Sequence, residues 1–217
     1  MIAYSTSRAP QEIRSFEKGP TDPVSLALRQ SQPALFFAAG SEIYGQGEKA
    51  GSLYRVEFGA VRVYRLLADG RRQISAFHLA GETFGFEADS THHFFAEAIV
   101  GTGIHVFCLS TGADFSREVL PLALRGMTRA QEHLLVLGRQ NAIERVAAFL
   151  VDMTERQGGL NEVELPMSRQ DIGDYLGLTI ETVSRIFSKL RGKGIIKLRG
   201  LRTVEIAKLG ALETTCE

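Results

Sequence analysis

The chain has 217 residues, 44% of them hydrophobic, and its 25 basic side chains are balanced by 25 acidic ones, so its formal net charge is zero. A chain of this length can bury a substantial core, divided into about one or two domains. The zero net charge argues against a partner held by overall charge, but it leaves room for a local basic patch.

Membrane insertion and export are both disfavoured. The sequence contains no run of about 18 apolar residues, which a membrane-spanning helix would need. Its first segment, MIAYSTSRAPQEIRSFEKGP, lacks the apolar core of a signal peptide. Two cysteines, Cys108 and Cys216, cannot form a dense disulfide framework. We therefore expect a cytoplasmic protein with reduced thiols and no membrane partner.

The first two ranges of the chain differ in pattern. Residues 1–30 are polar, carry three prolines and show no sustained period, which predicts a mobile or loosely docked arm, or a disordered segment. Residues 31–112 show short alternating runs separated by glycines, which is typical of the short strands of a barrel or jelly roll. Within this range, the segment ADGRR predicts a hairpin turn in which Asp69 and Gly70 take positive backbone dihedrals.

A long helix is predicted within residues 113–140. Its apolar side chains recur at heptad-like spacing, with Gln131 at the one skipped core position. These apolar residues are Leu120, Leu124, Met127 and Leu134. A narrow apolar stripe is typical of a two-stranded coiled coil, so we expect these residues to hold a homodimer. The alternative is a helix that packs against its own barrel.

Residues 141–217 predict a helix, a helix-turn-helix and a β-hairpin. The first helix begins at Asn141, and glycines end it. Ser168, with Asp171 three residues later, gives a start like a capping box. Gly177 can supply the left-handed turn that ends this helix, and Thr179 caps the next one. The segment GIIKLRGLRTVEI then predicts a basic hairpin, or wing.

The second helix of such a unit presents its N-terminal residues to base edges in the major groove. Glu181, Ser184 and Arg185 are spaced three and four residues apart and share one outward face. Arg can pair with guanine through two hydrogen bonds, Glu can accept one from cytosine, and Ser can contact either base. An alternative is a solvated basic helix on which Glu181 pairs with Arg185.

The same stretch is rich in basic residues. From Arg185 to Arg199 the chain has six basic residues and no acid, a pattern typical of a surface that binds a polyanion. Phosphate contacts fix register without reading sequence. We expect them from Ser168, Arg169, Thr179, Thr182, Lys189, Arg191, Lys193, Lys197, Arg199 and Arg202. Double-stranded DNA is therefore the expected partner.

The segment MSRQDIGDYLGLTIETVSRIFSKLRGKGIIKL resembles the DNA-binding domain of the CRP/FNR superfamily of bacterial transcription regulators. NAIERVAAFL is similar to the helix that precedes this domain, and the resemblance extends over roughly residues 30–207. It implies an α+β fold with an N-terminal cyclic-nucleotide-type β-roll (a jelly roll), a long dimerisation helix and a C-terminal winged helix-turn-helix.

The resemblance also implies a DNA target. ETVSR, from Glu181 to Arg185, matches the FNR-type pattern with Ser184 at the middle position, whereas the CRP pattern has an additional Arg where this chain has Ile180. The implied target is a palindrome, TTGA, six unspecified bases, TCAA, whose guanine–cytosine pair suits Arg185 and Glu181. The hairpin ADGRR stands where family activators touch RNA polymerase. It makes Asp69, Arg71 and Arg72 candidate polymerase contacts, with a merely solubilising turn as the alternative.

The two common sensors of the family do not match. Cyclic-AMP-binding members carry Gly-Glu and later an Arg for the cyclic phosphate; Gly81-Glu82 is present, but STHHFFAEA has no such Arg. An iron–sulfur cluster needs four thiolates, and this chain has two cysteines. Haem is a remaining alternative. The competing interpretation places His92 and His93 in a surface loop and His105 on a strand, with no role in haem binding. The candidate haem ligands are His78, His92, His93, His105 and Met127.

A member that lacks both sensors resembles the FixK branch, whose regulators are intermediates in cascades that respond to low oxygen. We therefore predict a dimeric transcription regulator, an activator by preference, with no bound cofactor or metal. An enzyme is not expected, because the chain has no glycine-rich phosphate loop, nucleophile elbow or paired zinc-ligand motif. The alternative from another class is a ligand-binding β-roll whose C-terminal domain serves protein contacts.

Overall fold

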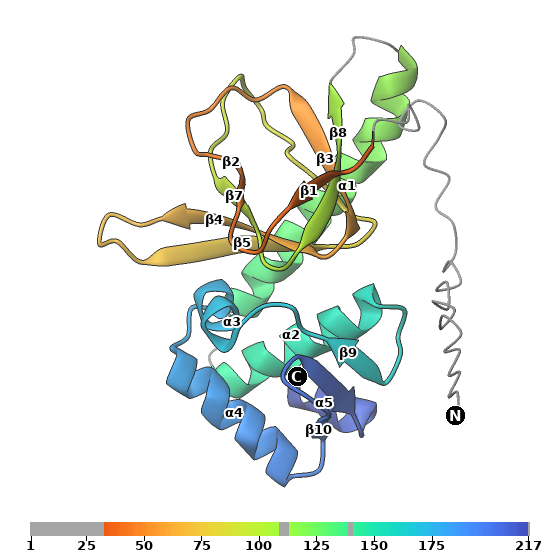
Figure 1. Cartoon of the computed structure of the whole chain (residues 1–217). Helices are drawn as coiled ribbons and strands as arrows, with labels where there is room; N and C mark the ends of the chain where they lie inside the picture. Colours follow the sequence, from red (N-terminus) through yellow and green to blue (C-terminus); the bar gives the residue numbers. More distant parts are fainter. Residues whose placement is uncertain (1–32, 109–112, 139–140, 217) are drawn as a thin grey trace, which may run out of the picture.

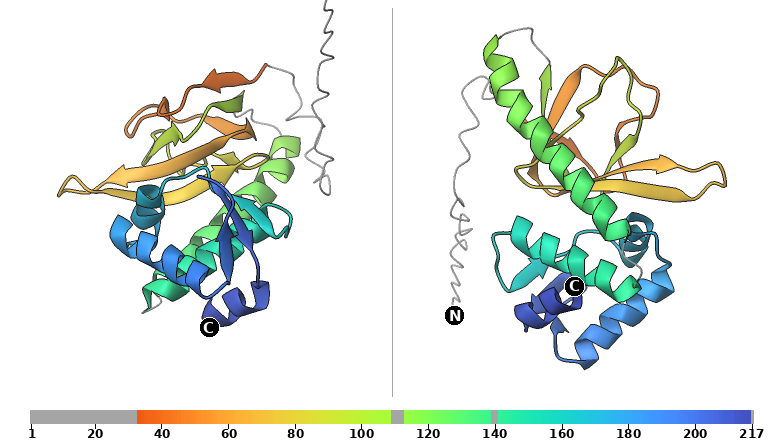
Figure 2. Two further views of the ribbon diagram at one scale, coloured as in Figure 1. Left: turned by 60° about the horizontal axis from the view of Figure 1, so that its bottom comes forward. Right: turned by 180° about the vertical axis from the view of Figure 1, so that it is seen from behind.

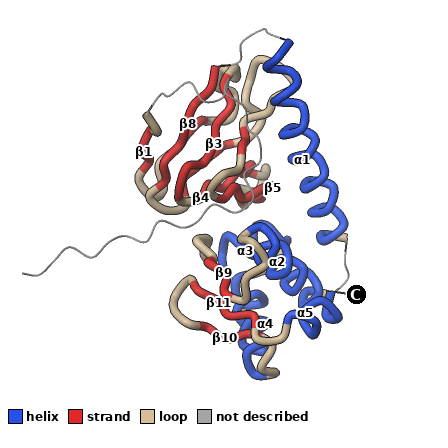
Figure 3. Tube along the Cα trace, turned by 90° about the vertical axis from the view of Figure 1, so that its right-hand side faces the viewer, coloured by secondary structure: helices blue, strands red, loops and turns tan. Residues whose placement is uncertain are grey.

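The structure, a computed structural model, describes residues 33–108, 113–138 and 141–216. The predicted N-terminal arm lies outside these ranges. A β-roll sits above a C-terminal domain, and one long helix, α1, runs along the β-roll and ends at the C-terminal domain (Figures 1 and 3). Seen from behind, this helix crosses the β-roll diagonally and ends at the C-terminal domain (Figure 2). No helix within the described ranges is long and apolar enough to span a membrane.

The β-roll consists of two four-stranded antiparallel sheets, with strand orders β1-β8-β3-β6 and β2-β7-β4-β5. This confirms the predicted jelly roll. The strands are β1 (Leu35–Phe37), β2 (Glu42–Tyr44), β3 (Ser52–Phe58), β4 (Ala60–Leu66), β5 (Arg72–Leu79), β6 (Thr83–Phe84), β7 (Phe95–Ala98) and β8 (Thr102–Cys108).

The turn between β4 and β5 differs from the predicted one. Gly70 has a φ of +81°, but no residue other than glycine has a positive φ in the described ranges, so Asp69 does not. Instead, the Asp69 carboxylate accepts a hydrogen bond from the Arg71 backbone N–H at 3.0 Å. The five-residue loop lets the aspartate stabilise the turn through its side chain, which removes the need for a second left-handed residue.

Two helices lead into the C-terminal domain. The first, α1 (Ala113–Leu137), confirms the predicted long helix, and the second, α2 (Ala142–Arg156), is capped by Asn141, where a helix was predicted to begin. The Asn141 side chain accepts a hydrogen bond from the Ile143 backbone N–H at 3.1 Å. The buried face of α2 contains Val146, Ala147, Phe149, Leu150, Met153 and Thr154.

The predicted helix-turn-helix and wing are present. Helix α3 (Arg169–Leu176) and helix α4 (Ile180–Gly192) are followed by the wing strands β10 (Ile196–Leu198) and β11 (Thr203–Ile206). Two elements had no clear sequence signal. Strand β9 (Glu162–Glu164) pairs with β11 and completes a three-stranded sheet, and helix α5 (Leu209–Cys216) packs against α2.

One hydrophobic cluster joins the two domains. Phe77 on β5 lies 5.0 Å from Tyr175 on α3 and 6.3 Å from Phe149 on α2, measured between ring centroids. The same cluster includes Ile74 and Leu79 of the β-roll. The C-terminal domain is therefore packed onto the β-roll and not merely tethered to it.

Close packing inside the helix-turn-helix requires a glycine at position 173. A Cβ there would stand 2.6 Å from the Leu178 carbonyl oxygen, which belongs to the turn before α4. The contact sets how closely α3 approaches this turn, because two backbones meet where no side chain fits.

We predict that Gly173→Ala destabilises the protein by about 1–3 kcal/mol, because the methyl group must push the turn away. Gly192→Ala is the matched control: no atom lies within 4 Å of its added Cβ, and position 192 is helical. Alanine there should stabilise the helix by about 0.5–1 kcal/mol. Urea unfolding of both variants measures the two effects. Equal stability of Gly173→Ala and wild type would show that the contact is not restrictive.

Candidate nucleic-acid interface

The first helix of the unit is held at both ends by local hydrogen bonds. The Ser168 hydroxyl accepts from the Asp171 N–H at 3.0 Å, and an Asp171 carboxylate oxygen accepts from the Ser168 N–H at 2.9 Å. This completes the predicted capping box. Gly177 ends the helix in the left-handed conformation with a φ of +64°. The turn is thereby fixed, and the start of α4 with it.

Helix α4 buries one face and exposes the predicted base-reading face. Its inward residues are Val183, Ile186, Phe187 and Leu190. Glu181, Ser184 and Arg185 are all exposed. The Thr179 hydroxyl caps the helix by accepting from the Thr182 N–H at 3.3 Å. The three candidate side chains therefore project from the first turns of a well-anchored helix.

Glu181 and Arg185 do not pair with each other in the described part of the chain. Arg185 Nη2 donates instead to the Thr182 hydroxyl, at 3.4 Å. The pKa of Glu181 is lowered by its own backbone N–H and by the Thr179 hydroxyl. The carboxylate therefore stays ionised, and the guanidinium keeps most of its donors available to another acceptor.

Arg169 is a cation that lies next to a ring. Its guanidinium lies over the Phe187 ring, 3.3 Å from the centroid, at the start of α3. Burial lowers its pKa to about 10, so it remains charged at neutral pH. Arg169 has no carboxylate partner among the described residues, so this partly buried cation can gain an anion, as the predicted phosphate contact would require.

The wing carries an acid that sequence reasoning missed. Lys197 Nζ lies 2.7 Å from a Glu205 carboxylate oxygen, and Arg199 pairs with the other oxygen of the same carboxylate. Lys197 and Glu205 are register partners of the β10–β11 ladder. The two cations lower the pKa of Glu205. The cluster of Lys197, Arg199 and Glu205 thus presents one net positive charge to a phosphate instead of two.

The predicted contacts fall in two groups along α4. Thr179, Glu181, Thr182, Ser184 and Arg185 gather at its start. The cations at positions 189, 191 and 193 are exposed at its other end, about 12 to 18 Å from Glu181 at about 1.5 Å per residue. That distance favours backbone contacts over base contacts for the second group.

In the β-roll, the carboxylate of Glu82 is already engaged. Arg156 of α2 contacts both of its oxygens, at 2.7 and 3.0 Å, and Arg129 of α1 approaches to 2.9 Å. Burial alone would raise the pKa of Glu82, but Arg156 and Arg129 more than offset it, so the pKa is lowered. The Gly-Glu motif therefore joins the β-roll to both helices here.

The histidines considered as haem ligands lie in different surroundings. His92 lies in the loop between β6 and β7, as the alternative interpretation placed it, but its side chain is buried: its ring stacks on Tyr44 with centroids 3.7 Å apart, and Nδ1 lies 3.1 Å from Glu87. His93 is exposed and pairs with Asp89. His105 lies on β8, as the alternative interpretation placed it. Among the described residues, no group of three or more His, Cys, Asp or Glu side chains could hold a metal.

One of the candidate polymerase contacts needs a correction. Asp69 and Arg71 pair at the exposed hairpin tip, 2.7 Å apart. Arg72 does not belong to this tip. It begins β5, its side chain is 23% exposed, and it pairs with Asp171 and Asp174 of α3. Arg71 is exposed, but Arg72 directly after it begins the strand and faces α3, because side chains alternate faces along a strand.

Comparisons with known proteins agree with this geometry. Residues 34–115 match the model of the cyclic nucleotide-binding domain, and residues 144–215 match that of the Crp-like helix-turn-helix domain. The nitrogen fixation regulation protein FixK of Rhizobium meliloti (strain 1021) is 54% identical over 216 residues, which cover 98% of this chain and 99% of the relative. FixK of Azorhizobium caulinodans is 43% identical over 88% of this chain and 81% of the relative.

A solved structure is similar over both domains. The structure of FixK2 from Bradyrhizobium japonicum superposes with a TM-score of 0.79 at 41% identity, over 85% of this chain and 98% of that one. The β-roll and winged helix-turn-helix together define a DNA-binding transcription regulator. The chain belongs to the FixK branch of the CRP/FNR family, whose members are transcription regulators and not enzymes.

The structure separates base contacts from backbone contacts, and variants can test the separation. Arg185→Ala should weaken binding to a TTGA palindrome by about 1–3 kcal/mol and affect a scrambled duplex much less. Lys197→Ala and Arg199→Ala should weaken both duplexes alike. Because Glu205 neutralises one of the two cations, the double variant should lower the salt slope by about one unit in total. Competition titrations over a salt series measure all of these effects.

Two outcomes would contradict the assignment. Equal loss on both duplexes for Arg185→Ala would make this residue a phosphate contact. A salt slope unchanged in the Lys197→Ala, Arg199→Ala double variant would remove the wing from the interface.

Glu181→Ala should lose discrimination at the guanine–cytosine pair while its general affinity holds or rises, because an acid leaves a surface that faces a polyanion.

Proposed function

We propose that the protein is a dimeric, sequence-specific activator that binds the palindrome TTGA, six unspecified bases, TCAA, without a bound effector. The observation that carries the proposal is the exposed start of α4, where Glu181 and Arg185 stand unpaired with each other. Two relatives are named nitrogen fixation regulation proteins. The proposal adds a place in a low-oxygen regulatory cascade, which the resemblance to the FixK branch implies.

Effector independence is supported by the contacts inside the β-roll. The Glu82 carboxylate, which a cyclic nucleotide would need, is held by Arg156 and Arg129. STHHFFAEA contains no Arg for the cyclic phosphate: the ring of His92 is buried against Tyr44, and the exposed His93 pairs with Asp89. The Glu82 contacts link the β-roll to the helices without a ligand.

Titration of the purified protein tests the proposal. Without added cyclic AMP, haem or iron–sulfur cluster, it should prefer the palindromic duplex over a scrambled one by about a thousandfold or more at physiological salt. Affinity for both duplexes should fall as salt rises. Binding that appears only after one of these effectors is added would reject effector independence. Equal affinity for both duplexes in every condition would reject sequence-specific binding itself.

The dimer is supported by an apolar face of α1 that nothing in the described chain covers. Along this helix the predicted residues are 48–66% exposed, namely Leu120, Leu124, Met127 and Leu134, and Leu135 is 73% exposed. A large apolar face is costly in water and is typical of an interface. A two-fold dimer would place two α4 helices at half-sites about 34 Å apart.

We expect Leu124→Glu and Leu134→Glu to give monomers that bind the palindrome poorly, because each places a charge in the dimer core. Leu160→Glu is the matched control, since Leu160 is 64% exposed but lies outside α1. It should remain dimeric. Sedimentation velocity distinguishes the two cases, and a dimer that survives both α1 substitutions would contradict the proposed interface.

The RNA polymerase contact belongs to the hairpin tip. Asp69 and Arg71 are exposed and pair with each other, so the tip is a defined charged surface. Arg72 pairs with α3 instead, so the candidate contact comprises Asp69 and Arg71 alone. In this proposal they touch polymerase at promoters where the dimer is bound beside it, while DNA affinity depends on α4 and the wing.

A further inference from the structure

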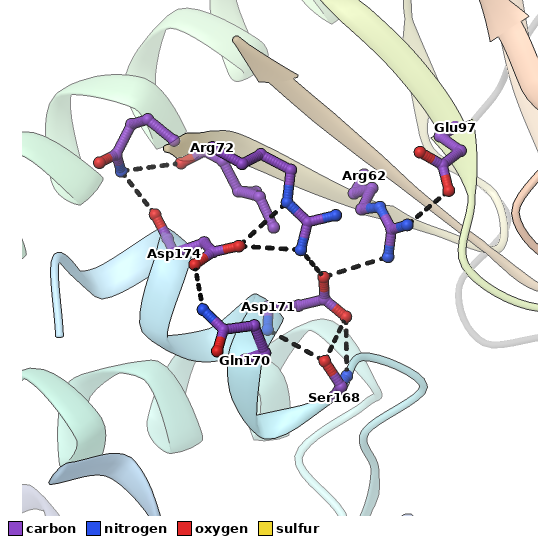
Figure 4. Close-up of polar contacts among 9 residues, drawn as sticks. Arg62, Arg72, Glu97, Ser168, Gln170, Asp171 and Asp174 are labelled. Carbon is purple, nitrogen blue, oxygen red and sulfur yellow. Dashed lines mark hydrogen bonds and ion pairs between the residues drawn. The ribbon is translucent and has the colours of Figure 1, made fainter. Parts of the chain in front are cut away.

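Two arginines of the β4–β5 hairpin reach across the domain boundary to α3 (Figure 4). Arg62 on β4 donates from Nη1 to Asp171 Oδ1 at 3.1 Å, and its Nη2 pairs with Glu97 of β7. Arg72 on β5 donates from Nη2 to the same Asp171 oxygen at 2.5 Å and from Nε to Asp174 at 3.0 Å. We call Arg62, Arg72, Asp171 and Asp174 the hairpin latch.

The hairpin latch is shielded from solvent. The side chains of Asp171, Asp174 and Arg62 are 4%, 14% and 16% exposed. Burial alone would lower the pKa of Arg72, but Asp174 and Asp171 more than offset it, so the pKa is raised. Losing one partner of such a pair strands a buried charge, so the interaction resists opening more than a surface ion pair would.

Asp171 links two structures through its two oxygens. Oδ2 accepts from the Ser168 N–H at 2.9 Å and from its hydroxyl at 2.7 Å, which closes the start of α3. Oδ1 accepts from both arginines. The carboxylate that caps the first helix of the DNA-binding unit therefore also fastens that helix to the β-roll.

Further contacts fix the orientation at a second place. Gln73 Nε2 donates to the Asp174 carbonyl at 2.7 Å, beside the hairpin latch. Arg156 of α2 pairs with Glu82 and donates to the Phe77 carbonyl at 2.7 Å. Attachment at both α3 and α2 leaves the C-terminal domain little freedom to rotate. The reading face of α4 remains exposed, because the β-roll contacts α3 instead.

We infer that Arg62 and Arg72 are positioning residues for DNA recognition: they hold the helix-turn-helix in its binding orientation, where a bound effector would otherwise be needed. The inference rests on the proposed function and deepens it, because it names what replaces the effector. In a dimer that reads two half-sites, a rotated domain would place α4 out of register with the groove. A smaller competent population lowers the apparent affinity by the same factor.

Charge reversal and charge swap test the inference. Arg72→Asp places an acid against Asp171 and Asp174, and should weaken binding to the palindrome about tenfold or more, as the competent fraction falls to about a tenth. The double variant Arg72→Asp, Asp174→Arg restores an opposite pair and should recover most of the loss. The quantity compared is the ratio of the affinities for the palindromic and scrambled duplexes. The added positive charge at position 174 strengthens binding to both duplexes alike, so its effect cancels in this ratio.

Arg65→Asp is the matched control. Arg65 lies on the same hairpin and is exposed, with its guanidinium 5.5 Å from the centroid of the Phe94 ring, on its own domain. The same charge reversal there should leave the affinity ratio within about twofold of wild type, since no latch residue is touched. Thermal unfolding of each variant shows that it is folded.

A second readout uses no DNA. Small-angle scattering should show a larger radius of gyration for Arg72→Asp than for wild type, and a return towards wild type in the charge swap. The inference would be overturned if Arg72→Asp had the same radius of gyration and affinity ratio as wild type. It would also be overturned if the charge swap recovered neither quantity relative to the single variant. Failure of the wild type to prefer the palindrome would instead reject the proposed function. The scattering comparison would then decide for or against the hairpin latch on its own.

Discussion

The carboxylate of Asp171 is the constraint on which the arrangement of this regulator depends. It closes the capping box at the start of α3 and accepts hydrogen bonds from two arginines of the β-roll. Local helix geometry and domain orientation are thus set by the same side chain (Figure 4). An acid in this position would be costly if left unpaired in a buried site. Its pairing with Arg62 and Arg72 turns that cost into a defined contact between domains.

The DNA-facing surface uses charge differently from the domain boundary. At the boundary, acids and bases neutralise one another in shielded pairs. At the start of α4, Glu181 and Arg185 stay apart in the described chain, which suits groups that must each find a partner on a base. The wing is intermediate, since Glu205 neutralises part of its positive charge. A chain of zero net charge can thereby present a local surface for a polyanion.

Much of this could be predicted from the sequence, because its signals are local. The caps at Ser168 and Thr179, the glycine at 177 and the spacing of buried residues define α3 and α4 between Ser168 and Gly192. Glu205 and the role of Arg72 could not be predicted. Glu205 acts through Lys197, its partner on the neighbouring strand, and Arg72 acts through Asp171 and Asp174, about a hundred residues away in sequence. Periodicity reveals neither kind of pairing. Strand β9 was missed for the same reason: three residues gain strand geometry by pairing with β11.

In the proposed mechanism, the C-terminal domain already has its binding orientation before DNA binds. Distances measured by double electron–electron resonance test this most directly. Nitroxide labels would be placed at Arg65 and Glu213, both exposed and one on each domain, after Cys108 and Cys216 are replaced by serine. Dilution with unlabelled protein isolates the distance within one chain. We predict one narrow distribution that is unchanged when the palindromic duplex is added. A broad distribution without DNA that narrows or shifts on binding would contradict the account.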